Sequence, residues 1–203
     1  PGQREAGGTQ RELALGAGGG ITWEGLEPGV YSLVETATVS DHILDAREHH
    51  IQLFPGRDST IDLENDRRPN LTVVKRDADS GAPIADTVFL VEAADGHSVD
   101  EIRTGPDGSA TLENLLPGVY QISEKSVPSP YLLDAEPQLV TLYPNRDHTV
   151  YFENHKAPTI EIIKENSITH ERLSNVRFQV WYASNDTETG EYNDLGVFTT
   201  DEN

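Results

Sequence analysis

Lys75, Glu124 and Asn154 each stand at the end of a row of alternating apolar residues. The rows are Leu71, Val73, Lys75, then Tyr120, Ile122, Glu124, and then Val150, Phe152, Asn154. With the two-residue period of a β-strand, each polar group shares the inward face of its strand with the apolar residues before it. A buried polar group without a partner costs about 1–3 kcal/mol. The pattern therefore predicts that the three groups meet as one buried cluster.

An amine, a carboxyl group and a carboxamide in one apolar site can form an isopeptide bond. Lys attacks a carbonyl only as the neutral amine, and burial lowers its pKa from the usual value of about 10.4. Burial raises the pKa of a Glu, and a neutral Glu can donate a hydrogen bond to the Asn carbonyl and shuttle protons. We expect Lys75 as nucleophile, Glu124 as catalytic acid and Asn154 as electrophile, with ammonia released once and no turnover. A buried Lys–Glu ion pair with an Asn hydrogen bond is the alternative.

The chain repeats itself at an offset of 89 residues. Residues 22–31 resemble residues 111–120, and residues 63–65 resemble residues 152–154. The offset is constant, since 120 − 31 = 89 and 154 − 65 = 89. It places Glu35 at the position of Glu124, Asn65 at that of Asn154, and Lys164 at that of Lys75. A period of this length predicts whole domains in tandem.

The repeat sets the expected boundaries. Residues 1–20, rich in Gly, Gln, Arg and Glu, are predicted to be a loop or disordered segment. Residues 21–68 are predicted to be the carboxyl half of a module, 69–157 a complete module, and 158–203 the amino half of a third. Because the chain lacks Met and starts at Pro1, we expect a piece of a larger protein.

The two partial modules each hold only part of the triad. Glu35 and Asn65 lie in the first and Lys164 in the third, so neither can close its own bond within this sequence. One interpretation is a cut through a longer array. The other is complementation between chains, in which Lys164 of one chain meets Asn65 of the next.

The complete module is predicted to be an all-β antiparallel sandwich of about seven strands. Short runs rich in Val, Ile and Thr alternate with Gly, Pro, Asp and Asn turns every eight to twelve residues. The clearest strands are expected at residues 71–75, 88–93, 109–112, 120–125, 138–142 and 148–154. Turns are expected at residues 77–81, 94–96 and 106–108.

Composition narrows the range of functions. The net charge of −20 repels nucleic acid and anionic membranes. The chain has no Cys, so disulfides, thiol chemistry and Cys-based zinc sites are excluded. No apolar run approaches the roughly 20 residues of a membrane span. We therefore expect no nucleic acid, no membrane span in this sequence and no cofactor.

Other candidate sites have simpler explanations. The pair His49 and His50, with His42 nearby, could suggest a metal site. No third ligand has the spacing that a closed site requires, so no metal is expected. Asp77, Asp79 and Asp95 could bind calcium, but turn chemistry explains them. Trp23 and Trp181 are expected in the core, with a sugar-binding platform as the alternative.

Three motifs resemble the Cna B-type family, the SpaA-like, prealbumin-like repeat domains of Gram-positive surface adhesins and pilins. They are Thr-Val-Val-Lys-Arg-Asp-Ala-Asp-Ser-Gly at 72–81, the stretch from Gly108 to Glu124, and Tyr-Phe-Glu-Asn at 151–154. The resemblance covers about residues 21–203. It implies a transthyretin-like, Ig-like β-sandwich and a Lys75–Asn154 bond assisted by Glu124. It also implies an extracellular place on the cell wall of a Gram-positive bacterium.

Two functions follow as expectations. The first is a structural stalk or spacer of an adhesin or pilin-like protein, whose partners are the neighbouring modules of the same chain. The second is an adhesive module that binds a host extracellular matrix protein or a glycan. An accessory domain of a secreted enzyme is a weaker third hypothesis. No sortase anchoring motif is seen in the sequence. Residues 143–145, Tyr-Pro-Asn, only faintly resemble the pilin-polymerising motif and lack its Lys, so pilus assembly is not assigned.

Overall fold

The computed structural model describes residues 11–16, 18–94, 96, 98–134, 136–183 and 192–201. These residues form β-strands and no helix, so none of them could cross a membrane as a helix. The chain divides into two compact units, Pro1–Pro128 with Leu133–Asn154, and Ser129–Leu132 with His155–Asn203. The strands are β1 (Gly29–Val34), β2 (Glu48–Leu53), β3 (Leu71–Asp77), β4 (Val88–Ala93), β5 (Ser98–Arg103), β6 (Ser109–Leu112), β7 (Gly118–Ser126), β8 (Gln138–Leu142), β9 (His148–Asn154), β10 (Arg177–Tyr182) and β11 (Asn193–Thr199).

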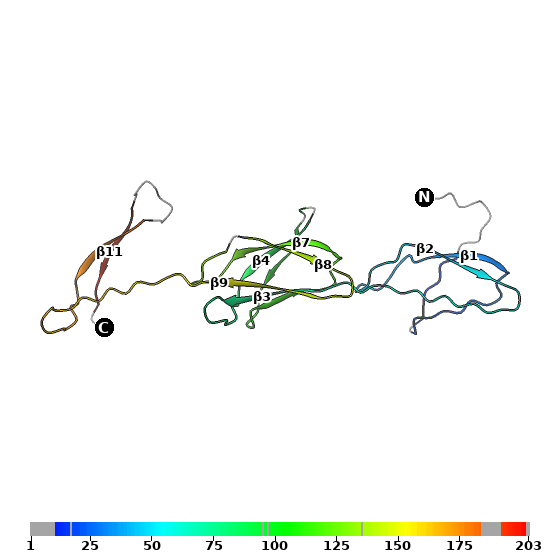
Figure 1. Cartoon of the computed structure of the whole chain (residues 1–203), viewed down its shortest axis with the longest axis horizontal. Coiled ribbons are helices and arrows are strands. Elements are labelled where there is room, and N and C mark those ends of the chain that lie inside the picture. Colours follow the sequence, from blue (N-terminus) through cyan, green and yellow to red (C-terminus); the bar gives the residue numbers. More distant parts are fainter. Residues whose placement is uncertain are drawn as a thin grey trace. The chain divides into compact units, whose positions relative to one another are not determined.

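Strands β3 to β9 build a two-sheet sandwich, drawn in green to yellow in Figure 1. One sheet has the order β6-β3-β9 and the other the order β5-β4-β7-β8. Alternate residues of both sheets point inward, as the sequence predicts. They form one core, made of Leu71, Val73, Phe89, Val91, Ile102, Tyr120, Ile122, Val140, Leu142, Val150 and Phe152.

The sandwich is not antiparallel throughout, which corrects the prediction. β3 pairs with β9 in parallel, with Lys75 opposite Phe152 and Asp77 opposite Asn154. The remaining pairs within the two sheets are antiparallel. Lys75 and Asn154 both lie toward the carboxyl ends of their strands, so only parallel pairing brings the two residues to the same end of the sheet.

The strand β5 is absent from the set of clear strands expected from the sequence. Its residues are mostly polar, and its apolar residues Val99 and Ile102 are three positions apart rather than two. A register shift between Val91 and Glu92 on the partner strand accounts for this, because Val91 pairs with Asp100 while Glu92 pairs with Ser98. This irregularity lets both Val99 and Ile102 pack against the core.

Two hairpins lie outside this sandwich. β1 pairs antiparallel with β2, and β10 pairs antiparallel with β11. The 89-residue offset makes residues 61–65 and 160–164 equivalent to parts of β9 and β3, but the structure gives them no strand pairing. In the sandwich β9 takes its ladder hydrogen bonds from β3. No described strand stands in the corresponding place beside either segment. Of the first 20 residues, 1–10 and 17 lie outside the described residues, and 11–16 form no strand.

The 89-residue offset recurs in the hydrogen bonds of the first hairpin region. Tyr31 Oη donates to Glu27 O at 2.9 Å, just as Tyr120 Oη donates to Leu116 O at 2.7 Å. The loops repeat as well. The backbone bonds Ile43 N–Asp66 O and Arg68 N–Asp41 O correspond to Leu132 N–His155 O and Ala157 N–Pro130 O.

The region before β10 repeats β3 and its turn in the same way. Ile84 N donates to Lys75 O at 3.0 Å, and Leu173 N donates to Lys164 O at 2.7 Å. Each partner lies 89 residues further along, since 173 − 84 = 89 and 164 − 75 = 89. The sequence repeat is therefore also a repeat of local backbone structure.

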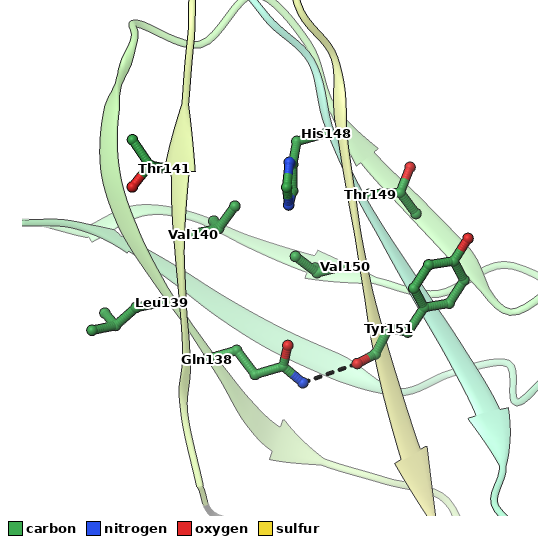
Figure 2. Close-up of a pocket in the computed structure, with 8 residues that line it drawn as sticks. All are labelled: Gln138, Leu139, Val140, Thr141, His148, Thr149, Val150 and Tyr151. Atoms are coloured by element: carbon green, nitrogen blue, oxygen red, sulfur yellow. Dashed lines mark hydrogen bonds between the residues drawn. The ribbon is translucent and has the colours of Figure 1, made fainter.

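A shallow groove runs between β8 and β9, the edge strands of the two sheets (Figure 2). Gln138 Nε2 donates a hydrogen bond across it to Tyr151 O at 2.9 Å. This side-chain contact links the sheet edges where the ladder of each sheet ends. The lining residues are Gln138, Leu139, Val140, Thr141, His148, Thr149, Val150 and Tyr151.

Gly108 in the turn before β6 supports the strand that carries Lys75. Its carbonyl accepts a hydrogen bond from Lys75 N at 2.7 Å, and its own N–H donates to Gly105 O at 2.9 Å. Its φ is +74°, and a Cβ placed there would lie 2.5 Å from Lys75 O and 2.9 Å from Pro83 Cβ. The turn predicted at residues 106–108 is thus confirmed, and its Gly is required by both the backbone angle and the close approach.

Gly108→Ala should therefore destabilise the chain by more than Gly81→Ala. Both positions have positive φ, but nothing lies within 4 Å of a Cβ at Gly81. The positive φ costs roughly 1 kcal/mol at either site, and the clash at Gly108 should add about 1–3 kcal/mol. Denaturant unfolding of both variants measures the difference, and equal losses of stability would contradict the assigned contact.

Candidate cross-linking site

The three polar residues that the sequence predicts to meet are all buried in the sandwich. Lys75 on β3 is 0 % exposed, Glu124 on β7 is 5 % exposed and Asn154 on β9 is 2 % exposed. The prediction that each of the three rows faces inward is confirmed. The chemical roles of the three residues stay predictions.

Glu124 contacts both of the other groups. Lys75 Nζ lies 3.2 Å from Glu124 Oε2, and Asn154 Nδ2 donates to Glu124 Oε1 at 2.8 Å. The 3.2 Å contact is an ion pair without good hydrogen-bond geometry, and Nζ and Oε2 find no other hydrogen-bond partner among the described residues. The carboxyl group is therefore placed to exchange protons with either neighbour.

The orientation of the Asn154 amide differs from the expected one. The sequence analysis expects a neutral Glu that donates to the Asn carbonyl, whereas here the amide nitrogen donates to the carboxylate. An ionised carboxylate only accepts hydrogen bonds, so it selects the NH₂ side of the amide. The observed contact is the one that suits the ion-paired state of Lys75 and Glu124.

Burial makes the amine of Lys75 easier to deprotonate than an exposed one. Burial in the apolar core lowers the pKa of its amine, and the facing Glu124 carboxylate opposes that change. Nζ lies 5.9 Å from the centre of the Phe152 ring, and that ring packs against Phe89 with centres 4.8 Å apart. Phe152 and Phe89 both belong to the apolar core in which Lys75 is fully buried.

Backbone hydrogen bonds fix the strands that carry the site. Lys75 is held on both sides, by Gly108 O and by Ile84 N. On the opposite sheet, Phe89 of β4 pairs with Glu124 of β7. Asn154, the last residue of β9, is held through its carbonyl by Ala78 N at 3.0 Å. The three side chains thus come from rigid elements, which is the usual requirement for a preorganised site.

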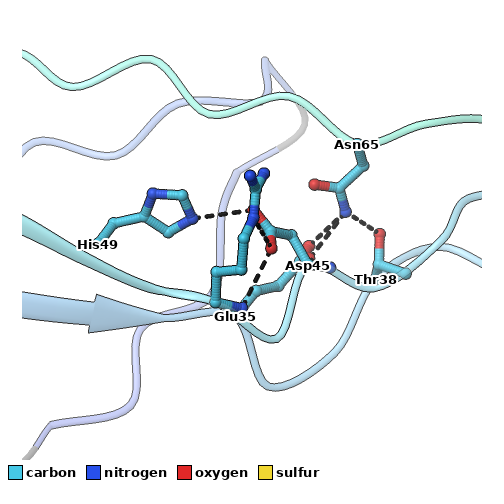
Figure 3. A network of polar contacts seen from close by, with 6 residues as sticks. Glu35, Thr38, Asp45, His49 and Asn65 are labelled. Atoms are coloured by element: carbon cyan, nitrogen blue, oxygen red, sulfur yellow. Dashed lines mark hydrogen bonds and ion pairs between the residues drawn. The ribbon is translucent and has the colours of Figure 1, made fainter.

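A second polar cluster lies near the β1–β2 hairpin (Figure 3). Asn65 Nδ2 approaches both carboxylate oxygens of Glu35, at 2.7 and 2.8 Å, and Thr38 Oγ1 at 2.8 Å. Asp45 N donates to Glu35 Oε2 at 2.7 Å. The structure therefore brings Glu35 and Asn65 together with the same donor and acceptor as Asn154 and Glu124.

Lys164 is not in such a cluster. It is exposed, and its Nζ donates to Glu165 O at 3.2 Å. The apolar residue Ile160, which the offset places at the position of Leu71, is 82 % exposed. No sheet among the described residues covers this segment.

Three of the residues considered as metal ligands contact a neighbouring group or close a turn. His49 Nε2 lies 2.9 Å from Asp45 Oδ2, and hydrogen bonds from Arg47 lower the pKa of the Asp45 carboxyl. His42 Nδ1 lies 2.9 Å from Asp41 Oδ1. Asp77 Oδ1 accepts the N–H groups of Asp79 and Ser80, as turn chemistry predicts. Asp95 lies outside the described residues.

Both Trp residues are exposed, which corrects the prediction that they lie in the core. Trp23 is 38 % and Trp181 is 57 % exposed. Trp181 alternates with the half-buried Phe178 and Val180 on β10, so it faces outward. Its parity along the strand was the signal that the sequence analysis missed.

Residues 69–156 match the family described as SpaA, prealbumin-like fold domain. A collagen adhesin of Staphylococcus aureus is 32 % identical over 118 residues, which are 54 % of this chain and 10 % of that protein. The chain thus spans about a tenth of the curated relative that it matches.

Solved structures to which the chain is similar include the TIE protein of Bacillus anthracis and a minor pilin of Streptococcus agalactiae. The first has a TM-score of 0.47 at 19 % identity and covers 87 % of this chain and 33 % of its own. The second has a TM-score of 0.42 at 20 % identity and covers 69 % of this chain and 65 % of its own.

The family match spans the whole sandwich from β3 to β9, including Lys75, Glu124 and Asn154. Residues 69–156 therefore match the SpaA prealbumin-like family, the family that the sequence resembles.

Proposed function

We propose that the chain is a stalk or spacer segment of a cell-surface adhesin or pilin-like protein, strengthened by a Lys75–Asn154 isopeptide bond. The observation that carries the proposal is the buried contact of Glu124 with both Lys75 and Asn154. The collagen adhesin relative and the SpaA family match support the setting. The chain then acts on itself once and is not a turnover enzyme.

The proposed reaction conserves protons within the site. Glu124 takes a proton from the Lys75 ammonium, which leaves a neutral amine and a neutral acid in the apolar interior. The Nζ lone pair attacks Asn154 Cγ. Glu124 then protonates the departing Nδ2 and takes a second proton from Nζ. The Cγ–Nδ2 bond breaks, ammonia leaves, and a Nζ–Cγ amide remains.

The bond would join the first and last strands of the domain. Lys75 and Asn154 are 79 residues apart (154 − 75), and their strands are direct neighbours in the sheet. Tension that enters through β3 could leave through β9 without unfolding the chain between them. By the loop-entropy argument for disulfides, closing a loop of this length stabilises the domain by roughly 4 kcal/mol.

The wider organisation is also a proposal. The repeated hydrogen bonds at the 89-residue offset support one complete module at 69–157 and partial modules at 21–68 and 158–203. In this arrangement Glu35, Asn65 and Lys164 belong to further cross-links completed outside their own partial modules. The partners are neighbouring modules, and the place is the extracellular cell wall of a Gram-positive bacterium.

The proposed bond predicts that the mass of the purified chain is about 17 Da below the mass calculated from its sequence, the mass of one lost ammonia. Lys75→Met keeps the side-chain volume and removes the nucleophile, so it should restore the full mass. It should also lower the unfolding free energy by roughly 4 kcal/mol. Intact mass spectrometry and denaturant unfolding measure the two effects.

Lys125→Met is the matched control, because Lys125 forms an exposed ion pair with Glu101 at 2.8 Å. An exposed pair contributes about 0–1 kcal/mol, so this variant should keep the mass deficit and most of the stability. A wild-type chain of full mass would reject the cross-link.

A substitution at Glu124 separates its role in proton transfer from its role in packing. Glu124→Gln retains an acceptor for Asn154 Nδ2 but cannot take a proton from Lys75. We expect a folded chain that keeps its full mass, with circular dichroism reporting the fold. Glu101→Gln, at an exposed site, should keep the deficit. A cross-link that forms at the normal rate in Glu124→Gln would exclude Glu124 as the proton carrier.

An adhesive function is the second candidate, and exposed aromatic residues of the second unit favour it. Trp181 and Tyr192 are 57 % and 70 % exposed and line a shallow hollow. Aromatic faces of this kind stack against sugars and pack into protein interfaces. The ligand would be a glycan or a host matrix protein.

Trp181→Ala should then weaken binding to a glycan array or to immobilised collagen by about tenfold or more. Trp23→Ala is the control, since Trp23 lies outside the second unit. Absence of binding by the wild-type chain, or equal binding by both variants, would remove this candidate.

A further inference from the structure

Asp77 is a buried carboxyl group that the proposed reaction does not use. It is 2 % exposed and follows Lys75 as the next inward-facing residue of β3. The parallel register places it directly opposite Asn154. A charged side chain is rarely buried without a specific set of contacts. Its position therefore lies beside Asn154, the electrophile of the proposed reaction.

Asp77 organises the turn that follows β3. Its Oδ1 accepts hydrogen bonds from Asp79 N at 3.0 Å and Ser80 N at 2.8 Å. Its backbone closes the same turn, because its carbonyl accepts from Gly81 N and its N–H donates to Ala82 O, both at 2.8 Å. The four bonds fix the backbone from residue 77 to residue 82.

That turn holds the end of β9. Ala78, the residue after Asp77, donates its N–H to Asn154 O at 3.0 Å. Asn154 is the last residue of β9, and strand ends are where local opening is easiest. The Asp77 side chain therefore orients the peptide group that holds the backbone of the electrophilic residue.

The repeat shows which property of Asp77 the turn requires. The residue 89 positions later is Asn166, since 77 + 89 = 166. Asn166 Oδ1 accepts from Ile168 N at 2.8 Å and from Thr169 N at 3.1 Å, the same two bonds. An uncharged amide oxygen thus supports the same turn, so the acceptor matters rather than the charge.

We propose that Asp77 is a positioning residue for the cross-link, which holds Asn154 in place against Glu124 by fixing the 77–82 turn. The inference rests on the proposed function. Its reason is geometric: near-attack geometry is sensitive to displacements of about 1 Å, which can cost about a hundredfold in rate.

The test follows ammonia loss after synthesis of the full chain in a cell-free system, by intact mass spectrometry of samples quenched over time. Asp77→Ala should slow the reaction by at least about tenfold at a temperature where circular dichroism reports a folded chain. Asp77→Asn should react within about threefold of wild type, because it keeps the acceptor.

Asp147→Ala is the matched control for loss of a backbone cap. Asp147 Oδ1 accepts Asn70 N at 2.8 Å, just before the amino ends of β3 and β9. It should react within about threefold of wild type, because its cap lies at the end of the strand pair away from Asn154. If Asp77→Ala does not fold, Asp77→Ser, with a shorter acceptor, should give an intermediate rate.

Each result has a distinct meaning. Normal rates in Asp77→Ala or Asp77→Ser would overturn the positioning role while leaving the cross-link intact. Equal slowing of Asp77→Asn and Asp77→Ala would overturn the acceptor argument. Equal slowing of Asp147→Ala and Asp77→Ala would reduce the effect to general stability. A wild-type chain that never loses ammonia would overturn the proposed function, and this inference with it.

Discussion

The burial of one Lys amine is the constraint on which the sandwich depends. Lys75 is fully buried in an apolar core, where a lone ammonium would cost several kcal/mol. The chain compensates with Glu124 on the opposite sheet, which also accepts a hydrogen bond from Asn154 on the strand beside β3. The parallel pairing of β3 and β9 brings Lys75 and Asn154 to the same end of the sheet and places Asp77 opposite Asn154. An amide bond would remove the charge from the core permanently, which gives a physical reason for the cluster beyond its hydrogen bonds.

The same arrangement relates chemistry to mechanics. Lys75 and Asn154 lie on the first and last strands of the domain. The Gly108 turn holds β3 through Lys75 N, and the turn that begins at Asp77 holds the end of β9 through Ala78 N. In a chain without Cys, an isopeptide bond would give covalent reinforcement without dependence on redox conditions. The exposed Trp181 and Tyr192 belong to a different part of the chain and raise a separate question of adhesion.

Alternation in the sequence predicted the core and the three buried polar groups, because inward-facing rows at Leu71, Tyr120 and Val150 are long and regular. It did not predict the parallel pairing of β3 and β9, since turn spacing carries no information on strand direction. Alternation also missed β5, because a register irregularity breaks the period of two between Val99 and Ile102. The apolar residues before Lys164 also alternate, but the described residues include no sheet opposite them. Motif resemblance matched the same three residues of the site, whereas the role of the Asp77 turn could be seen only in the hydrogen bonds.

The most direct test is peptide mapping of the denatured wild-type chain after digestion with a protease that cleaves after Lys and Arg. The account predicts one branched peptide that joins residues 68–76 to residues 147–156, with fragment ions that place the link between Lys75 and Asn154. Cleavage after Lys75 should then be blocked. Recovery of both peptides unlinked and at full mass, with normal cleavage after Lys75, would contradict the account.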